Sequence, residues 1–180
     1  MSMLKEVLQI NGWVEVILKD KDGRIKVLIG DDGHKGDNGV MYRKYHYNYN
    51  LEDVVTNVGL AAMLRLIFHG FTENRFGYIA IGTGTTSESP EQTALENEII
   101  RKPANTLQMT TDITDDTVLL ENVFSSEDGL SGSHEITETG IFNADMGGIM
   151  LARKAFSRIP VNWDGGDNLY IRYFIQMRYG

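Results

Sequence analysis

Apolar and polar residues alternate with a period of two along much of the chain, which predicts a protein built mainly from β-strands. The clearest case is the segment 168–179, where every second residue from Leu169 to Tyr179 is apolar or aromatic. Shorter strands are predicted at 13–19 and 25–29, on either side of the pair Asp22-Gly23, which favours a tight hairpin turn. Turn-forming residues separate further predicted strands at 42–49, 106–111, 117–125, 134–142 and 149–156.

Two segments have helical patterns instead. Between residues 51 and 70 apolar residues recur at three- and four-residue spacing, with Asn50 as a candidate cap and Gly70 as a candidate end. This helix is apolar on more than one side, so we expect it to be largely buried, against a sheet or a partner chain. A shorter helix is predicted at about 90–100, since Ser89, Pro90 and Gln92 fit the capping position, first turn and capping box.

These elements predict one fold class. Several short strands with regular turn signals favour an antiparallel β-sandwich, immunoglobulin-like or jelly-roll-like, with one longer and one short α-helix. Residues 51–180 form the sandwich module in this prediction. Residues 1–50 form an N-terminal β-hairpin region, and two alternatives stay open: a separate small domain, or part of the same sandwich.

Composition narrows the class of partner. The chain has 180 residues, with 17 basic and 25 acidic side chains and a net charge of −8, which disfavours a nucleic-acid partner. Cysteine is absent, so disulfides, thiolate metal sites and cysteine nucleophiles are excluded. No apolar run reaches the length of a membrane span, and the start lacks the apolar core of a secretory signal, so we expect no membrane partner.

The stretch FGYIAIGTGTT at 76–86 raises the question of a nucleotide site, because glycine-rich turns after a strand can hold phosphate. A P-loop needs a lysine after its glycines, and no lysine follows Gly82 and Gly84 before Lys102. The dinucleotide fingerprint needs a third glycine, and Ser87 occupies that position. We therefore predict a turn, in which both glycines adopt conformations open mainly to glycine, and no cofactor.

Other candidate chemistry is sparse. The histidines, at 34, 46, 69 and 134, fall in different predicted elements and lack metal-ligand spacing. The acidic loop at 31–37 resembles a fragment of a calcium loop without its closing glutamate, and a weak ion site there stays open. Glu138 lies in an apolar setting and is interpreted as a carboxylate that accepts hydrogen bonds from backbone N–H groups at a turn. Tyrosines at 42, 45, 47 and 49 indicate a core face or an interface, with equal weight, above ligand binding.

Four segments of the chain carry a resemblance, in this order: IAIGTGTT, TALENEIIRKP, ITETGIFNADMGGIMLARKAFSRIP and NLYIRYFIQMRYG. Through them the chain resembles a family of small tailed-bacteriophage virion proteins, found among tail, collar and fibre components. The resemblance covers about residues 53–180. The matching positions are Gly82, Thr83, Gly84, Thr85, Thr93, Ala94, Leu95, Asn97, Glu98, Arg101, Lys102, Glu138, Gly140, Ile141, Phe142, Gly147, Gly148, Leu151, Ala152 and Arg153.

The resemblance implies a virion structural protein without catalytic residues or cofactors, assembled in the host cytoplasm. Its partners would be further copies of itself and other virion proteins in a symmetric assembly, with the loops 31–38 and 125–133 as exposed contact candidates. Alternatives are a receptor- or carbohydrate-binding tail tip, a capsid decoration protein and, least favoured, an enzyme. The candidate turn or interface residues are Gly82, Gly84, Asn97, Glu98, Arg101, Glu138, Gly140, Arg153, Tyr45 and Tyr47.

Overall fold

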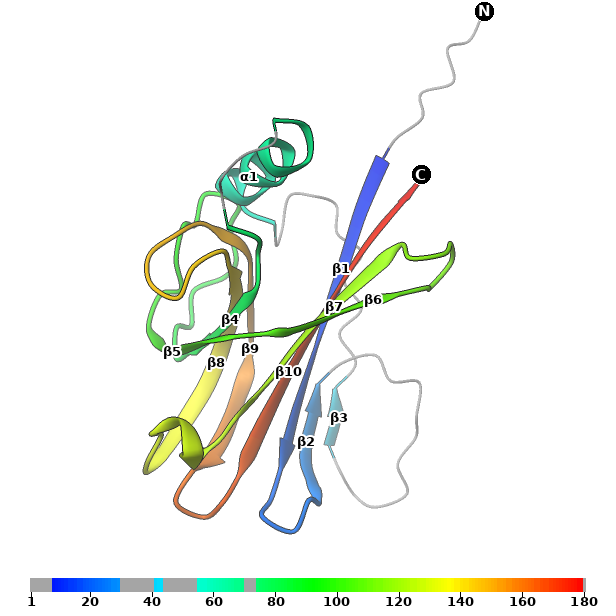
Figure 1. Ribbon diagram of the computed structural model, residues 1–180. Coiled ribbons are helices and arrows are strands. Elements are labelled where there is room, and N and C mark those ends of the chain that lie inside the picture. Colours follow the sequence, from blue (N-terminus) through cyan, green and yellow to red (C-terminus); the bar gives the residue numbers. More distant parts are fainter. Residues whose placement is uncertain (1–7, 30–40, 44–54, 70–73, 180) are drawn as a thin grey trace, which may run out of the picture.

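The computed structural model describes residues 8–29, 41–43, 55–69 and 74–179, which form a sandwich of two β-sheets (Figure 1). The six-stranded sheet has the order β3-β2-β1-β10-β7-β6 and the four-stranded sheet the order β5-β4-β8-β9. Neighbouring strands are antiparallel except β2 and β3, which are parallel. The predicted class, a mainly β sandwich, is confirmed.

The strand bounds follow the predicted alternation closely. The six-stranded sheet consists of β1 (Leu8–Lys19), β2 (Ile25–Ile29), β3 (Met41–Arg43), β6 (Asn105–Met109), β7 (Thr117–Phe124) and β10 (Asn168–Tyr179). The four-stranded sheet consists of β4 (Tyr78–Gly82), β5 (Glu98–Pro103), β8 (Ser133–Phe142) and β9 (Met150–Asn162). β9 continues beyond the predicted end at 156, and most of the tyrosine segment 42–49 lies outside the described residues.

The main core lies between the sheets, where alternate residues of facing strands meet. β1 pairs with β10 along its whole length, from Leu8↔Tyr179 to Lys19↔Asn168. Leu169, Ile171, Tyr173 and Ile175 of β10 share the core-facing side, as predicted. The buried cluster draws on both sheets: Val14, Val16, Leu18, Ile79, Ile81, Leu120, Phe124, Ile136, Ile141, Ile159, Val161, Trp163, Leu169, Ile171 and Tyr173. Burial of this apolar surface is the main stabilising contribution to such a fold.

The helix α1 (Asn57–Phe68) begins later than predicted and lies at one end of the sandwich (Figure 1). Its cap is Thr56, whose Oγ1 accepts from the N–H of Gly59 at 2.9 Å; Asn50 and Gly70 lie outside the described residues. A Cβ on Gly59 would stand 2.6 Å from the Cα of Leu151, so the helix backbone rests directly on β9.

Within its own chain this helix is not largely buried, so that part of the expectation is wrong, while burial against a partner chain stays a prediction. Within α1 only Gly59 and Ala62 are buried. Four apolar side chains on its outer face are exposed: Val58, Leu64, Ile67 and Phe68. Phe68 is the most exposed of them, at 74%. Close contact with β9 therefore uses the small residues of the helix, Leu60 and Met63 pack against the main core, and the other large apolar side chains lie outside.

The predicted helix at 90–100 is also wrong. The capping-type bonds do form, because the N–H of Ser89 donates to Gln92 Oε1 at 3.0 Å. They close a single turn, after which the chain enters β5 at Glu98 and pairs with β4. A local capping signal is satisfied here, but pairing with β4 decides the structure of residues 98–103.

Candidate functional site

Glu138 lies at the centre of the polar cluster that the sequence resemblance singled out. A register shift between Ile136 and Glu138 in the β8–β9 pairing marks a bulge at this point of β8. The side chain is 0% exposed. Its Oε1 accepts from the N–H groups of Gly84 and Asn97, both at 2.8 Å, and its Oε2 accepts from the N–H of Glu96 at 3.1 Å. The interpretation of Glu138 as a carboxylate bonded to backbone N–H groups at a turn is confirmed.

Arg153, on the neighbouring strand β9, completes this arrangement. It is 1% exposed, and its Nε donates to Glu138 Oε2 at 2.8 Å. Its Nη1 donates to the carbonyl of Thr86 at 2.9 Å and to Gln92 Oε1 at 3.2 Å. Charges removed from water are costly unless they are paired and hydrogen-bonded, and each charge here has both kinds of partner.

The partners of this ion pair belong to the loop at 83–97, the β4–β5 loop, which lies over the outer face of the four-stranded sheet. Leu95 of the loop packs into a second small apolar cluster with Ala80, Phe142 and Met150. Glu96 Oε2 accepts from the N–H groups of Thr85 at 2.7 Å and Thr86 at 2.9 Å. The loop has no helix or strand. Backbone N–H groups near both of its ends donate to the carboxylates of Glu138 and Glu96 instead.

A third carboxylate ties the middle of the loop to β9. Glu88 Oε1 accepts from the N–H of Ala155 at 2.9 Å and pairs with the ammonium of Lys154. Burial raises the pKa of Glu88, but hydrogen bonds from Lys154 and Ala155 outweigh it, so the pKa lies below its usual value of 4.5. The pKa of Glu96 is lowered by its hydrogen bonds with Thr86 and Thr85.

The glycines of GTGTT are required for close approach and not for an unusual backbone angle. Neither Gly82 nor Gly84 has a positive φ, so the predicted glycine-specific turn conformation is wrong. A Cβ on Gly84 would stand 2.5 Å from Glu138 Oε1, and a Cβ on Gly82 would stand 2.5 Å from the carbonyl of Asn97. Gly140 is similarly close, at 3.0 Å from both the Ala152 carbonyl and a methyl group of Leu95.

Arg101 and Glu98 form a separate contact beside this cluster. Arg101 binds Glu98 through two hydrogen bonds, of 3.0 and 2.6 Å. Its guanidinium carbon lies 3.4 Å from the ring centre of Phe142, a cation–π contact. Its Nη1 donates to the carbonyls of Ala144 and Gly147 at 3.0 and 2.8 Å, which holds the β8–β9 turn against β5.

Several of the remaining candidates lie outside the residues that the structure describes. Tyr45, Tyr47 and the acidic loop 31–37 lie outside the described residues, as do His34 and His46. His134 accepts from the indole N–H of the buried Trp163 at 3.1 Å. Within the described parts of the chain, no group of three or more His, Asp or Glu side chains could hold a metal ion.

Sequence reasoning missed Glu88, Glu96 and Lys154 as structural residues. From the sequence alone, the acidic residues after GTGTT count only as groups that repel phosphate. For Glu96 a usable signal was the run of Thr residues a few positions earlier, whose N–H groups it accepts from. Glu88 gives no such signal, because its partners Lys154 and Ala155 lie far away in the sequence.

A second carboxylate-centred loop, also missed, joins β6 to β7. Asp116 accepts from the N–H groups of Thr111 at 2.8 Å and Asp112 at 3.1 Å, and from Gln176 Nε2 at 2.8 Å. Desolvation raises the pKa of Asp116, but these hydrogen bonds more than offset it and hold the pKa well below its usual value.

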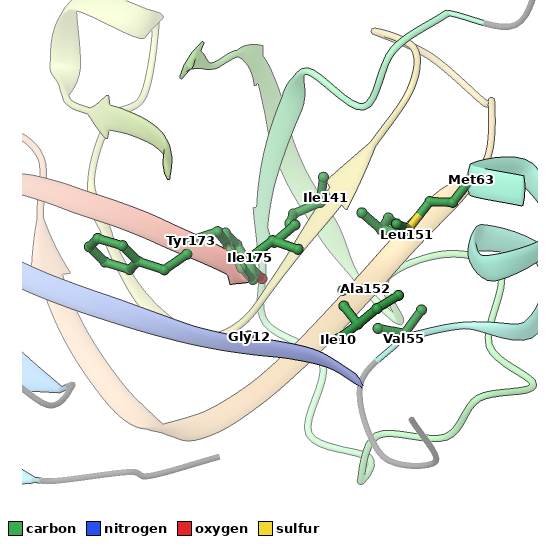
Figure 2. Close-up of a pocket in the computed structure, with 10 residues that line it drawn as sticks. Ile10, Gly12, Val55, Met63, Ile141, Leu151, Ala152, Tyr173 and Ile175 are labelled. Atoms are coloured by element: carbon green, nitrogen blue, oxygen red, sulfur yellow. The ribbon is translucent and has the colours of Figure 1, made fainter. Parts of the chain in front are cut away.

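A small apolar cavity opens between the sheets, where Met63 of α1 reaches toward Leu151 and Ile141 (Figure 2). Its lining also includes Ile10, Gly12, Val55, Ala152, Tyr173, Phe174 and Ile175. Its volume is about 20 Å³, the space of a single water molecule. A cavity of this size and character is a packing gap and not a binding site for an organic ligand.

Comparisons of the chain with protein families, with curated proteins and with solved structures find no significant match. Among the described residues, no helix is long and apolar enough to cross a membrane.

Replacement of Glu138 by glutamine tests the role of the buried ion pair. We expect Glu138→Gln to lower the free energy of unfolding by about 3–5 kcal/mol, because Arg153 keeps a buried charge without its partner. Urea denaturation followed by circular dichroism measures the change. Glu135→Gln, on the same strand but in an exposed pair with Arg158, is the control and should stay within about 0.5 kcal/mol of wild type. Equal effects of the two substitutions would contradict this assignment.

Gly84→Ala tests the close approach of the loop backbone to Glu138. The added methyl group has no room beside Oε1, so we expect a loss of about 1–3 kcal/mol in the free energy of unfolding. Gly77→Ala is the matched control, because its Cβ would meet nothing nearer than 3.5 Å. A Gly84→Ala variant as stable as the control would show that the loop does not need glycine there.

The lowered pKa of Glu88 predicts a loss of stability in acid. The folded state binds this proton more weakly than the unfolded state, so the contribution is complete above pH 4.5 and is lost as the pH falls through the lower folded-state pKa. We expect Glu88→Gln to be less stable than wild type at pH 7 and the difference to shrink below pH 4.5. Denaturant titrations from pH 7 to pH 2.5 measure it, and a difference independent of pH would refute the prediction.

Proposed function

We propose that the chain is a structural protein of a tailed-bacteriophage particle, acting as a tail, collar or fibre adaptor through protein–protein contacts. The observation that carries the proposal is the meeting of the resemblance motifs in one place. A single hydrogen-bonded cluster contains residues from three parts of the chain: GTGT, TALENE and the strands around Glu138 and Arg153. That cluster holds the β4–β5 loop against the four-stranded sheet and so makes this part of the domain rigid, as a structural protein requires.

The polar groups of the cluster support a structural role more than a chemical one. Glu138 has two oxygens, and each already accepts two hydrogen bonds from the chain itself. A general acid or base needs a carboxylate within reach of a substrate proton, whereas this one lies beneath the loop at 0% exposure. The bonds it makes stabilise the fold at the motif positions.

The partners in this proposal are further copies of the chain and other virion proteins. The net charge of −8 favours protein contacts over contacts with the packaged genome, because nucleic-acid surfaces of proteins are usually basic. Structural parts around a tail or portal axis occur in many copies related by symmetry. The assembly would form from particle components in the host cytoplasm.

Immunogold electron microscopy tests the proposal directly. Purified particles of the phage that encodes the chain are labelled with an antibody raised against it, and we expect gold at the tail, collar or fibres. Antibody preabsorbed with the purified chain is the control. Label over the capsid surface would replace the tail assignment with decoration, and absence from both the micrographs and the virion mass spectra would refute a structural role.

A further inference from the structure

The outer edge of the six-stranded sheet is the feature that points to a further function. Among the residues that the structure describes, β6 pairs with β7 on one side only and is the last strand of its sheet (Figure 1). Asn105, Thr106, Leu107 and Gln108 are all exposed. An edge strand presents a row of unpaired N–H and C=O groups that can pair with another strand.

The sequence and register of this edge strand lack three protections that natural proteins give to exposed strands: charged residues, proline and a bulge. From Ala104 to Thr111 the chain has no charged residue and no proline, and the β6–β7 register has no bulge. Such features are the usual means of preventing association between edges, so their absence marks β6 as available for pairing.

The edges of the four-stranded sheet are different. β5 carries Glu98, Arg101, Lys102 and Pro103. The free side of β9 is covered in part, since Thr56 N–H donates to the Leu151 carbonyl at 2.8 Å and Glu88 accepts from Ala155 N–H. Compared with both edges of the four-stranded sheet, β6 is the more open to pairing.

A row of apolar side chains ends at this edge. The register places Trp13 opposite Phe174, Phe174 opposite Leu119, and Leu119 opposite Leu107, all on the outer face of the sheet. Trp13 and Phe174 stack with ring centres 4.9 Å apart. Exposure rises from 4% at Leu119 to 58% at Leu107, so the row stops at the edge in an uncovered leucine.

We propose that β6 pairs antiparallel with β6 of a second copy of this chain, on a two-fold axis at Leu107. This register pairs all five residues: Leu107 with its own copy, Thr106 with Gln108, and Asn105 with Met109. The exposed leucines meet side by side, and the apolar row continues into the second sheet. The pairing brings no charged side chains of β6 together, so a like-charge penalty is absent from the joint.

The joint between the two strands is small, which limits the binding energy available to it. Two five-residue strands bury much less than the roughly 1,600 Å² of a standard interface. We therefore expect a dimer with a dissociation constant weaker than about 1 μM, which becomes stronger where many copies are held together. This inference deepens the proposed function by naming its self-contact, but it is measured on the purified chain and does not depend on the chain being found in a particle.

Sedimentation velocity across a concentration series tests the dimer. We expect wild type to shift from monomer to dimer as concentration rises, and Leu107→Lys to remain monomeric, because two like charges then face each other on the axis. Met146→Lys adds the same charge at an apolar residue that is 82% exposed on another turn, and it should dimerise like wild type. Thermal melts confirm that both variants are folded.

Single cysteines test the register, since the chain has none of its own. Leu107→Cys should form a disulfide-linked dimer on mild oxidation. Asn105→Cys alone should not, because its two copies would lie about 13 Å apart, but mixed with Met109→Cys it should cross-link.

Three results would overturn the proposal: a wild-type chain that stays monomeric up to its solubility limit, a dimer that survives Leu107→Lys, or a dimer abolished by Leu64→Lys on the helix α1. Cross-linking of Asn105→Cys with itself would refute the register.

Discussion

The structure of the four-stranded sheet and its loop depends on the hydrogen bonds and the ion pair that the buried carboxylate of Glu138 makes. Glu138 carries a carboxylate into a site without exposure to solvent, where it would be strongly unfavourable alone. Its four donors come from both ends of the β4–β5 loop and from the next strand. The loop and the ion pair therefore require each other. Without the loop, Glu138 and Arg153 would lose their hydrogen-bond partners in it, and without Glu138 and Arg153 the backbone groups of the loop would lose theirs.

Because the loop is held on only one of the sheets, the outer faces of the two sheets differ. The loop covers the outer face of the four-stranded sheet and adds a second apolar cluster around Leu95. The six-stranded sheet has a row of aromatic and aliphatic side chains on its outer face and an uncharged strand at its β6 edge. If the chain acts in an assembly as proposed, the half built around the ion pair would keep its shape and the other half would supply the contact.

The sequence predicted the strands well and the loop badly, for one physical reason. Alternation along β10 reports burial of alternate side chains, which is a local consequence of facing a core. The helix predicted at 90–100 rested on Ser89, Pro90 and Gln92, whose local preferences are met by one turn. Beyond that turn, the path of the chain is decided by Glu138, some forty residues away in the sequence, and by pairing with β4. Local patterns carry no information about such distant partners.

The likeness of GTGTT to a phosphate-binding loop has a structural cause. Successive backbone N–H groups after a strand point at an anion here as well, since Gly84 donates to Glu138, and Thr85 and Thr86 donate to Glu96. The anion is a carboxylate of the chain itself. A phosphate would have to displace both side chains and lie against their charges, after which Arg153 would lose its partner at Glu138. The glycine-rich segment therefore does hold an anion, but that anion is a carboxylate built into the fold.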